Sequence, residues 1–115
     1  INQKSKTLME WIPIAISSLS IADVQAVVIN GKRLVLVNEN NTFYVFKNKC
    51  PHAGADLSGA ECREGYLICP IHRYKYSLDT GRGAKGQGDY LKNYPTKVVG
   101  DNLLIGFKKP WFKFW

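Results

Sequence analysis

Two short motifs near the middle of the chain constrain its fold and function more than any other feature. Cys50-Pro51-His52 and Cys69-Pro70-Ile71-His72 each place a cysteine two or three positions before a histidine. Together they hold both histidines of the 115-residue chain and two of its three cysteines. A cysteine and a histidine this close in sequence can reach one small object from one loop. The pattern therefore predicts two loops that face a shared metal centre.

Three interpretations compete for this constellation. Coincidence is disfavoured because the mixed motif occurs twice. A tetrahedral zinc site suits the ligand types but not their order, because zinc fingers group cysteine with cysteine and histidine with histidine. A [2Fe-2S] cluster in which histidines replace cysteines on one iron fits the mixed order best. Each loop then gives one ligand to each iron, with Cys50 and Cys69 on one iron and His52 and His72 on the other.

The segment before the first motif is patterned for antiparallel strands. Residues 24–48 contain three apolar, β-branched or aromatic runs. The first two are separated by Asn30-Gly31, which tolerates positive φ at both positions and is a strong hairpin signal. The second and third are separated by the polar turn 38–41. This stretch predicts a three-stranded antiparallel meander.

The segment after the first motif indicates further short strands and one long loop. The glycine-rich residues 81–90 predict the loop, and a single helical turn is expected near residues 17–22. The strands are expected at 65–70, 74–78 and in a hairpin over 96–107 that turns at 100–102. The predicted fold class is therefore all-β, with antiparallel sheets in a single domain, residues 1–115.

Composition and charge limit the partners. The net charge of +7 comes mainly from scattered lysines, which indicates a solvated surface or a basic face that steers toward an acidic protein. The basic, aromatic tail 107–115 lacks any accompanying nucleic-acid motif, so nucleic-acid binding is not predicted. No apolar run is long enough to span a bilayer, and the N-terminal segment lacks the pattern of a signal peptide. An odd number of cysteines favours a reducing compartment, and we expect the cytoplasm.

On these residues the sequence resembles the Rieske [2Fe-2S] proteins, specifically the soluble Rieske ferredoxin type. The resemblance runs from about Trp11 to Phe107. It includes the two ligand motifs, the intervening "ADLSG", the following "YSLDTG" and the ending "YPTKVVGDNLLIGF". It implies one [2Fe-2S] cluster per chain and a fold with a base domain plus a small cluster-binding subdomain, about residues 49–90, that carries the two ligand loops.

The resemblance also implies a function in electron transfer. The chain would carry one electron between a reductase and a terminal oxygenase or another redox enzyme. Both histidines serve as ligands, so none remains for acid–base catalysis, and we expect no catalytic residue. One alternative is the small subunit of an assimilatory nitrite reductase, and a second is a zinc-stabilised interaction domain. The sequence does not name the donor, the acceptor or the oligomeric state.

Three residues beside the second loop are candidates to tune the cluster. In high-potential relatives a tyrosine at the position of Tyr76 donates to a ligand cysteine, and a serine stands where this chain has Tyr74. Arg73 occupies a position that is commonly glycine. The extra disulfide of those relatives is absent because its positions correspond to Ala55 and Ile71. We therefore expect a potential in the lower part of the Rieske range of roughly −150 to +300 mV.

The third cysteine, Cys62, lies between the motifs and outside both of them. Buried free cysteines commonly act as small apolar residues, and Cys62 is interpreted in that way rather than as a ligand.

Overall fold

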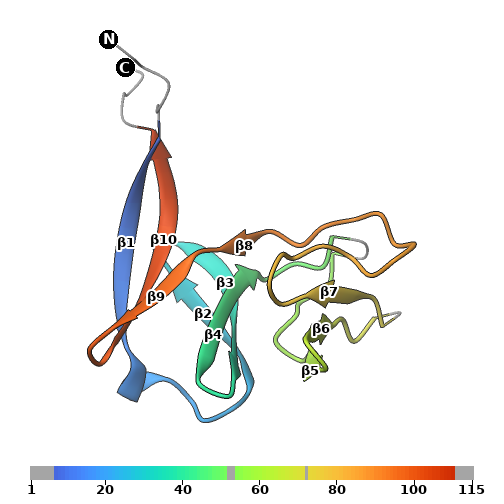
Figure 1. Ribbon diagram of the computed structural model, residues 1–115, viewed down its shortest axis with the longest axis horizontal. Helices are drawn as coiled ribbons and strands as arrows, with labels where there is room; N and C mark the ends of the chain where they lie inside the picture. Colours follow the sequence, from blue (N-terminus) through green and yellow to red (C-terminus); the bar gives the residue numbers. More distant parts are fainter. Residues whose placement is uncertain (1–6, 52–53, 72, 111–115) are drawn as a thin grey trace.

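The structure, a computed structural model, describes residues 7–51, 54–71 and 73–110. Short antiparallel strands dominate this part of the chain, which confirms the predicted fold class. Figure 1 shows them arranged around a long two-stranded ribbon, a central sheet and a smaller sheet beside it. The elements are β1 (Thr7–Ala15), η1 (Ile16–Ser18), β2 (Val24–Ile29), β3 (Lys32–Glu39), β4 (Thr42–Lys47), β5 (Glu61–Arg63), β6 (Tyr66–Ile68), β7 (Lys75–Ser77), β8 (Asn93–Tyr94), β9 (Thr96–Val99) and β10 (Asn102–Pro110).

The strands form three sheets. Sheet A has the order β1-β10-β9, sheet B the order β2-β3-β4-β8 and sheet C the order β5-β6-β7. The chain therefore begins and ends in sheet A among the described residues, and the other two sheets are built from the segment between. Sheet C falls inside the stretch 49–90, where a cluster-binding subdomain is predicted; that subdomain boundary remains a prediction.

Strand β3 is buried on both faces and joins two hydrophobic cores. Its residues Leu34–Val37 are four consecutive side chains with no solvent exposure. Neighbouring side chains of a strand point to opposite faces. The first and third of the four accordingly pack with Leu103 and Ile105 of β10, and the second and fourth pack with Leu67 of β6. Each such side chain contributes about 1.5–3 kcal/mol when fully buried. Sheet B is thus the central layer.

The core between sheets B and C positions the predicted ligands. Cys50, Cys69 and Tyr76 belong to it and are each fully buried. They pack with aliphatic side chains from β3 and β6. The thiols therefore sit at the inner edge of a hydrophobic core rather than on a free surface.

The meander predicted over residues 24–48 is confirmed, with strands β2, β3 and β4 pairing in sequence order. Asn30 and Gly31 both adopt positive φ, at 55° and 76°, as the expected hairpin turn requires. The polar turn is also confirmed, because Asn40 and Asn41 have φ values of 52° and 68°. The last hairpin turns at Gly100-Asp101, between β9 and β10.

The structure adds elements that the sequence analysis did not predict. The N-terminal segment forms β1, a nine-residue strand paired along β10. Pro13 lies within it, and proline is tolerated there because β1 is an edge strand and one of its sides needs no amide donor. The sequence analysis missed strand β5, because its three residues are polar or small and show no alternation of apolar and polar side chains. The expected helical turn near 17–22 is the 3-10 turn η1, one position earlier.

Candidate metal centre

The first cysteine motif lies in a tight loop directly after β4. The Cys50 amide donates to the Ala55 carbonyl at 2.8 Å, and the Gly54 amide donates to the Cys50 carbonyl at 2.7 Å. Gly54 has a φ of 71°, the left-handed conformation that lets the chain turn back. These two bonds close the loop around Cys50 and fix the direction of its side chain.

The second motif lies in a similar loop between β6 and β7. The Cys69 amide donates to the Tyr74 carbonyl at 2.8 Å, so this loop also closes across five positions. Arg73 stands in the left-handed region with a φ of 55°, where glycine is the favoured residue. Arg73 therefore adopts the left-handed backbone conformation that is expected of a glycine at this position.

The structure brings Cys50 and Cys69 together from these two loops. Neither cysteine forms a disulfide, and Cys69 interacts with Cys50. Burial raises the pKa of Cys69, and the contact with Cys50 raises it further, while a hydrogen bond from the Ile71 backbone acts in the opposite direction. Two buried sulfurs in one core are suited to serve as a pair of ligands for one iron.

The remaining two predicted ligands, His52 and His72, lie outside the described residues. Among the residues that are described, no group of three or more histidine, cysteine or acidic side chains is placed to hold a metal ion. The structure places Cys50 and Cys69 in one buried core, and the assignment of all four ligands remains a prediction.

Tyr76, predicted to act on a ligand cysteine, lies where that role requires. Its hydroxyl oxygen is 3.6 Å from the sulfur of Cys50, from its position on β7. The same hydroxyl donates to Asp89 Oδ2 at 3.1 Å. Burial raises the pKa of Tyr76 far above its usual value, and its contacts with Cys50 and Asp89 act in the same direction. Tyr76 therefore remains a neutral hydrogen-bond donor.

Asp89 is a neighbour of the site that the sequence analysis missed. It is the one carboxylate of the glycine-rich segment 81–90, and this was the signal available in the sequence. The segment is tied to β7, because Ala84 N–H donates to the Lys75 carbonyl and Lys75 N–H donates to Gln87 Oε1. These bonds carry Asp89 to the hydroxyl of Tyr76.

Arg73 is held by an ion pair with Glu61 of β5. Its Nη2 lies 3.1 Å from Glu61 Oε1, and Arg63 contacts the other oxygen of the same carboxylate. The hydrogen bond from Arg73 holds the pKa of Glu61 below its usual range. The charge of Arg73 is thus compensated at the edge of sheet C, which the sequence did not indicate. Tyr74, the third candidate, closes the loop with its carbonyl, and its ring packs partly buried against the core.

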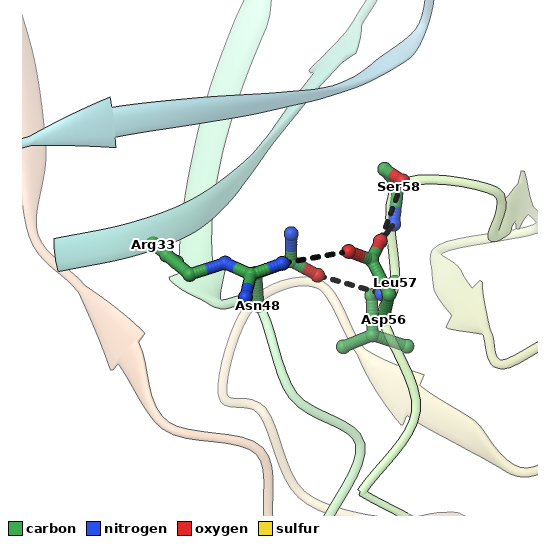
Figure 2. Close-up of polar contacts among 5 residues, drawn as sticks. All are labelled: Arg33, Asn48, Asp56, Leu57 and Ser58. Atoms are coloured by element: carbon green, nitrogen blue, oxygen red, sulfur yellow. Dashed lines mark hydrogen bonds and ion pairs between the residues drawn. The ribbon is translucent and has the colours of Figure 1, made fainter.

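A polar network anchors the chain that follows the first loop (Figure 2). Asn48 is a buried polar residue, and its Oδ1 accepts the Leu57 amide at 2.6 Å. Arg33 pairs with Asp56 at 3.2 Å. The hydrogen bonds from Ser58 hold the pKa of Asp56 below its usual value, with a smaller contribution from Arg33. The network fixes residues 56–58 to sheet B, and so it holds both ends of the Cys50 loop.

Cys62 takes no part in the centre. It lies on β5, half-buried, and its sulfur is 3.9 Å from Glu39 Oε2. Burial raises the pKa of this thiol to about 11, and the charge of Glu39 raises it as well. Cys62 is therefore a protonated thiol at neutral pH, in agreement with the structural role expected from the sequence.

A comparison of the chain with known protein families identifies the kind of metal centre. Residues 10–95 match the family model described as the Rieske [2Fe-2S] domain. The chain belongs to that family. The match includes both cysteine loops, all of sheets B and C, and most of β1. Two adjacent buried sulfurs, with an imidazole-bearing residue two or three positions after each cysteine, are the donor set that a Rieske cluster needs.

The relatives with known roles include ferredoxin components of oxygenase systems. The chain is 32% identical over 74 residues to the ferredoxin component of an alkene monooxygenase system from Xanthobacter autotrophicus (strain ATCC BAA-1158 / Py2), a match that spans 61% of that protein. It is 29% identical over 98 residues to the ferredoxin component of a naphthalene 1,2-dioxygenase system from Pseudomonas aeruginosa. The second match covers 84% of this chain and 94% of the relative.

Solved structures share the same fold. The ferredoxin of carbazole 1,9a-dioxygenase from Nocardioides aromaticivorans IC177 aligns with a TM-score of 0.69 over 81% of this chain and 95% of that chain, at 22% identity. The putative NADH-dependent nitrite reductase small subunit from Mycobacterium tuberculosis aligns with a TM-score of 0.73 over 87% of this chain and 96% of that chain, at 19% identity. The Rieske fold predicted from the sequence is confirmed.

This Rieske domain carries a [2Fe-2S] cluster and is an electron carrier rather than an enzyme. The cluster supplies one-electron chemistry, and neutral imidazole ligands raise its potential above that of an all-cysteine cluster. The chain buries Cys50 and Cys69, places the Tyr76 hydroxyl beside Cys50 and compensates the charge of Arg73 with Glu61. The one helix among the described residues is three residues long, so none of them could cross a membrane as a helix.

Proposed function

We propose that this protein is the ferredoxin component of an oxygenase system, which accepts one electron from a reductase and delivers it to the terminal oxygenase. The observation that carries the proposal is the match to the naphthalene dioxygenase ferredoxin, which extends over 94% of that protein's length. A match of that extent leaves little of the relative without a counterpart here. A second naphthalene dioxygenase ferredoxin, from Pseudomonas putida, matches over 95% of its length at 27% identity.

The cluster is proposed to be held by Cys50 and Cys69 on one iron and by His52 and His72 on the other. The buried pair of sulfurs supports the first half of this assignment. The positions of the histidines in the sequence support the second half, because each follows its cysteine by two or three positions. Three cysteines without a disulfide suit a reducing compartment, and we place the protein in the cytoplasm.

A role as the small subunit of a nitrite reductase is the second candidate. The chain shares its fold with the small-subunit structure. At 19% identity this alignment supports the shared fold but not the shared role. The two roles differ in assembly, since a shuttling ferredoxin binds its partners transiently and a subunit binds permanently.

Affinity purification of the tagged chain from its own cells at low salt separates the two. The proposal expects the protein to elute mostly as a free [2Fe-2S] protein, with a flavin reductase and an oxygenase as minor companions. Electron paramagnetic resonance of the dithionite-reduced protein is expected to show a Rieske-type signal. A stoichiometric complex with a sirohaem or flavin nitrite reductase would replace the proposal with the second candidate.

A further inference from the structure

A groove lined by lysines runs beside the Cys50 loop. It is a hollow of about 610 Å³ at one end of sheet B. A second hollow, of about 420 Å³, shares most of its lysines and reaches Cys50 and Pro51. We call the two hollows together the lysine groove. Its exposed lysines are Lys32, Lys47, Lys49 and Lys92.

The fold assembles this groove from distant parts of the chain. Lys47 lies opposite Leu34 in the pairing of β3 with β4, and Lys32 is the first residue of β3, two positions before Leu34. The Lys47 amide donates to the carbonyl of Lys92 at 2.9 Å, which brings the segment before β8 alongside. Strand pairing therefore brings the four lysines together, and the sequence contains no continuous run of basic residues that would predict the groove.

The positive charge of the groove is not compensated from within. Its one acidic lining residue is Asp56, and that carboxylate is paired with Arg33 at 3.2 Å (Figure 2). Within residues 7–51, 54–71 and 73–110, none of the four lysines makes an ion pair with a carboxylate. Four like charges around one hollow repel one another and produce a strong local field.

The chemistry of the groove indicates what it binds. Phosphate groups are best recognised by the bidentate fork of arginine, and the one arginine here is already engaged by Asp56. Lysine ammonium groups are compact, hydrated point charges that suit scattered carboxylates on a protein surface. The groove also borders the loop of a ligand cysteine, so a protein seated there lies close to the cluster.

We propose that the lysine groove docks the acidic face of a redox partner protein and guides it to the Cys50 side of the cluster. This rests on the proposed electron-transfer function. A field of this kind raises the rate of encounter with an oppositely charged partner, and salt weakens it, because the Debye length falls from about 30 Å at 10 mM to about 8 Å at 150 mM ionic strength.

The test measures electron transfer into the oxidised, cluster-loaded protein by stopped flow. The probe is a reduced plant-type [2Fe-2S] ferredoxin of net negative charge, whose potential of about −400 mV makes the transfer downhill. The wild-type second-order rate constant is expected to fall at least about tenfold between 10 mM and 200 mM salt. Lys47→Glu and Lys92→Glu are each expected to lower it by about three- to tenfold at low salt and to flatten its salt dependence.

Lys97→Glu is the matched control. It changes the net charge equally but lies on β9 of sheet A, where its ammonium stacks 4.2 Å from the Trp11 ring centroid. It is expected to change the rate constant by less than about twofold. Oxidation of each reduced variant by the cation hexaammineruthenium(III) should not be slowed, which shows that the cluster and its potential are intact.

Equal losses in all three variants would overturn the proposal, because the effect would then reflect net charge and not the groove. Binding of a labelled single-stranded DNA that depends on Lys47 and Lys92, with unchanged electron-transfer rates, would also overturn it in favour of a nucleic-acid surface. Absence of a reducible cluster in the wild type would instead refute the proposed function. The two failures are therefore distinguishable.

Discussion

The Tyr76 hydroxyl donates to Asp89 Oδ2 at 3.1 Å while its oxygen lies 3.6 Å from the sulfur of Cys50. A phenol has one proton to donate, so the carboxylate and the sulfur compete for it. The Asp89 carboxylate also carries a negative charge, and the Tyr76 hydroxyl lies between it and the Cys50 sulfur. Both effects leave the Cys50 sulfur richer in negative charge, and so we expect Asp89 to hold the potential of the cluster down.

The first prediction concerns this competition. Asp89→Ala is expected to raise the midpoint potential by tens of millivolts, because the Tyr76 proton becomes available to the sulfur and a negative charge is removed; for one electron, about 59 mV corresponds to 1.4 kcal/mol. Protein-film voltammetry of the variant measures it.

The matched control combines Asp89→Ala with Tyr76→Phe. If Asp89 acts through the hydroxyl, the rise is smaller in the Tyr76→Phe background, where only the loss of charge remains. An equal rise in both backgrounds would show that Asp89 acts by its charge alone.

The second prediction tests the ligand set. His52→Ala or His72→Ala removes an iron ligand, and we expect the Rieske-type paramagnetic signal to disappear, with loss of the cluster or conversion to another species. Cys62→Ser is the matched control and should retain the full signal and the acid-labile sulfide, since Cys62 lies on β5 beside Glu39. A colourless Cys62→Ser protein would show that the ligand assignment is wrong.

The third prediction concerns the reactivity of Cys62. A raised pKa of about 11, against an ordinary value of 9.0, reduces the thiolate fraction at pH 8. Alkylation by iodoacetamide, followed by mass spectrometry of the cluster-loaded protein, is expected to be about 100-fold slower than in the same protein in urea. Half-maximal reactivity should be reached near pH 11.

The raised pKa of Cys62 has a consequence for stability. The folded state holds the proton of Cys62 more tightly than the unfolded chain does. The stabilisation of the folded state that results is fully present below pH 9 and is lost as the pH rises from about 9 to about 11. Cys62→Ser should therefore lose less stability than the wild type across that window. An equal loss in both proteins would contradict the raised pKa.

The fourth prediction compares two polar contacts that anchor the Cys50 loop. Asn48→Ala leaves the amide of the buried Leu57 without its acceptor, and we expect a loss of about 1–3 kcal/mol in the free energy of unfolding. Arg33→Ala breaks an exposed ion pair, in which the Arg33 side chain is 73% exposed, and should cost less than about 1 kcal/mol. Urea unfolding followed by the visible absorption of the cluster measures both. The reverse order would show that the surface pair is the stronger anchor.

The fifth prediction concerns the start of the glycine-rich loop. Gly81 has a φ of 80°, and a Cβ at this position would overlap the carbonyl oxygen of Leu91. Gly81→Ala is expected to lower the stability by about 3–5 kcal/mol, as the sum of backbone strain and steric overlap. Gly86→Ala is the control, because Gly86 has a φ of 91° but open space around it, and about 1–2 kcal/mol is expected. Thermal unfolding measures the difference, and equal losses would exclude the overlap with Leu91.

Local patterns in the sequence were sufficient to predict three of the four strands of the central sheet and the two cysteine loops. The Asn30-Gly31 turn and the apolar runs around it determine β2 and β3 within a few residues of sequence, and the two repeated motifs identify the loops. These features depend on near neighbours and on backbone conformations that particular residues prefer.

Features that depend on distant segments were not predictable in the same way. β1 is stabilised by its pairing with β10, about ninety positions away, and no local pattern in the sequence predicts that pairing. Asp89 reaches Tyr76 because the glycine-rich loop folds back along β7, and the lysine groove forms because three separate segments meet. The residues involved have no local signal beyond their charge, since tertiary packing alone selects their neighbours.

The two-sided burial of β3 links the metal centre to the far side of the molecule. Leu34 and Leu36 pack in the core with β10, whereas their neighbours Val35 and Val37 pack in the core that contains Cys50. A cavity in the core between β3 and β10 would therefore destabilise β3, the strand that both cores share. We therefore expect the lifetime of the cluster in air to depend also on side chains in the core that does not contain Cys50.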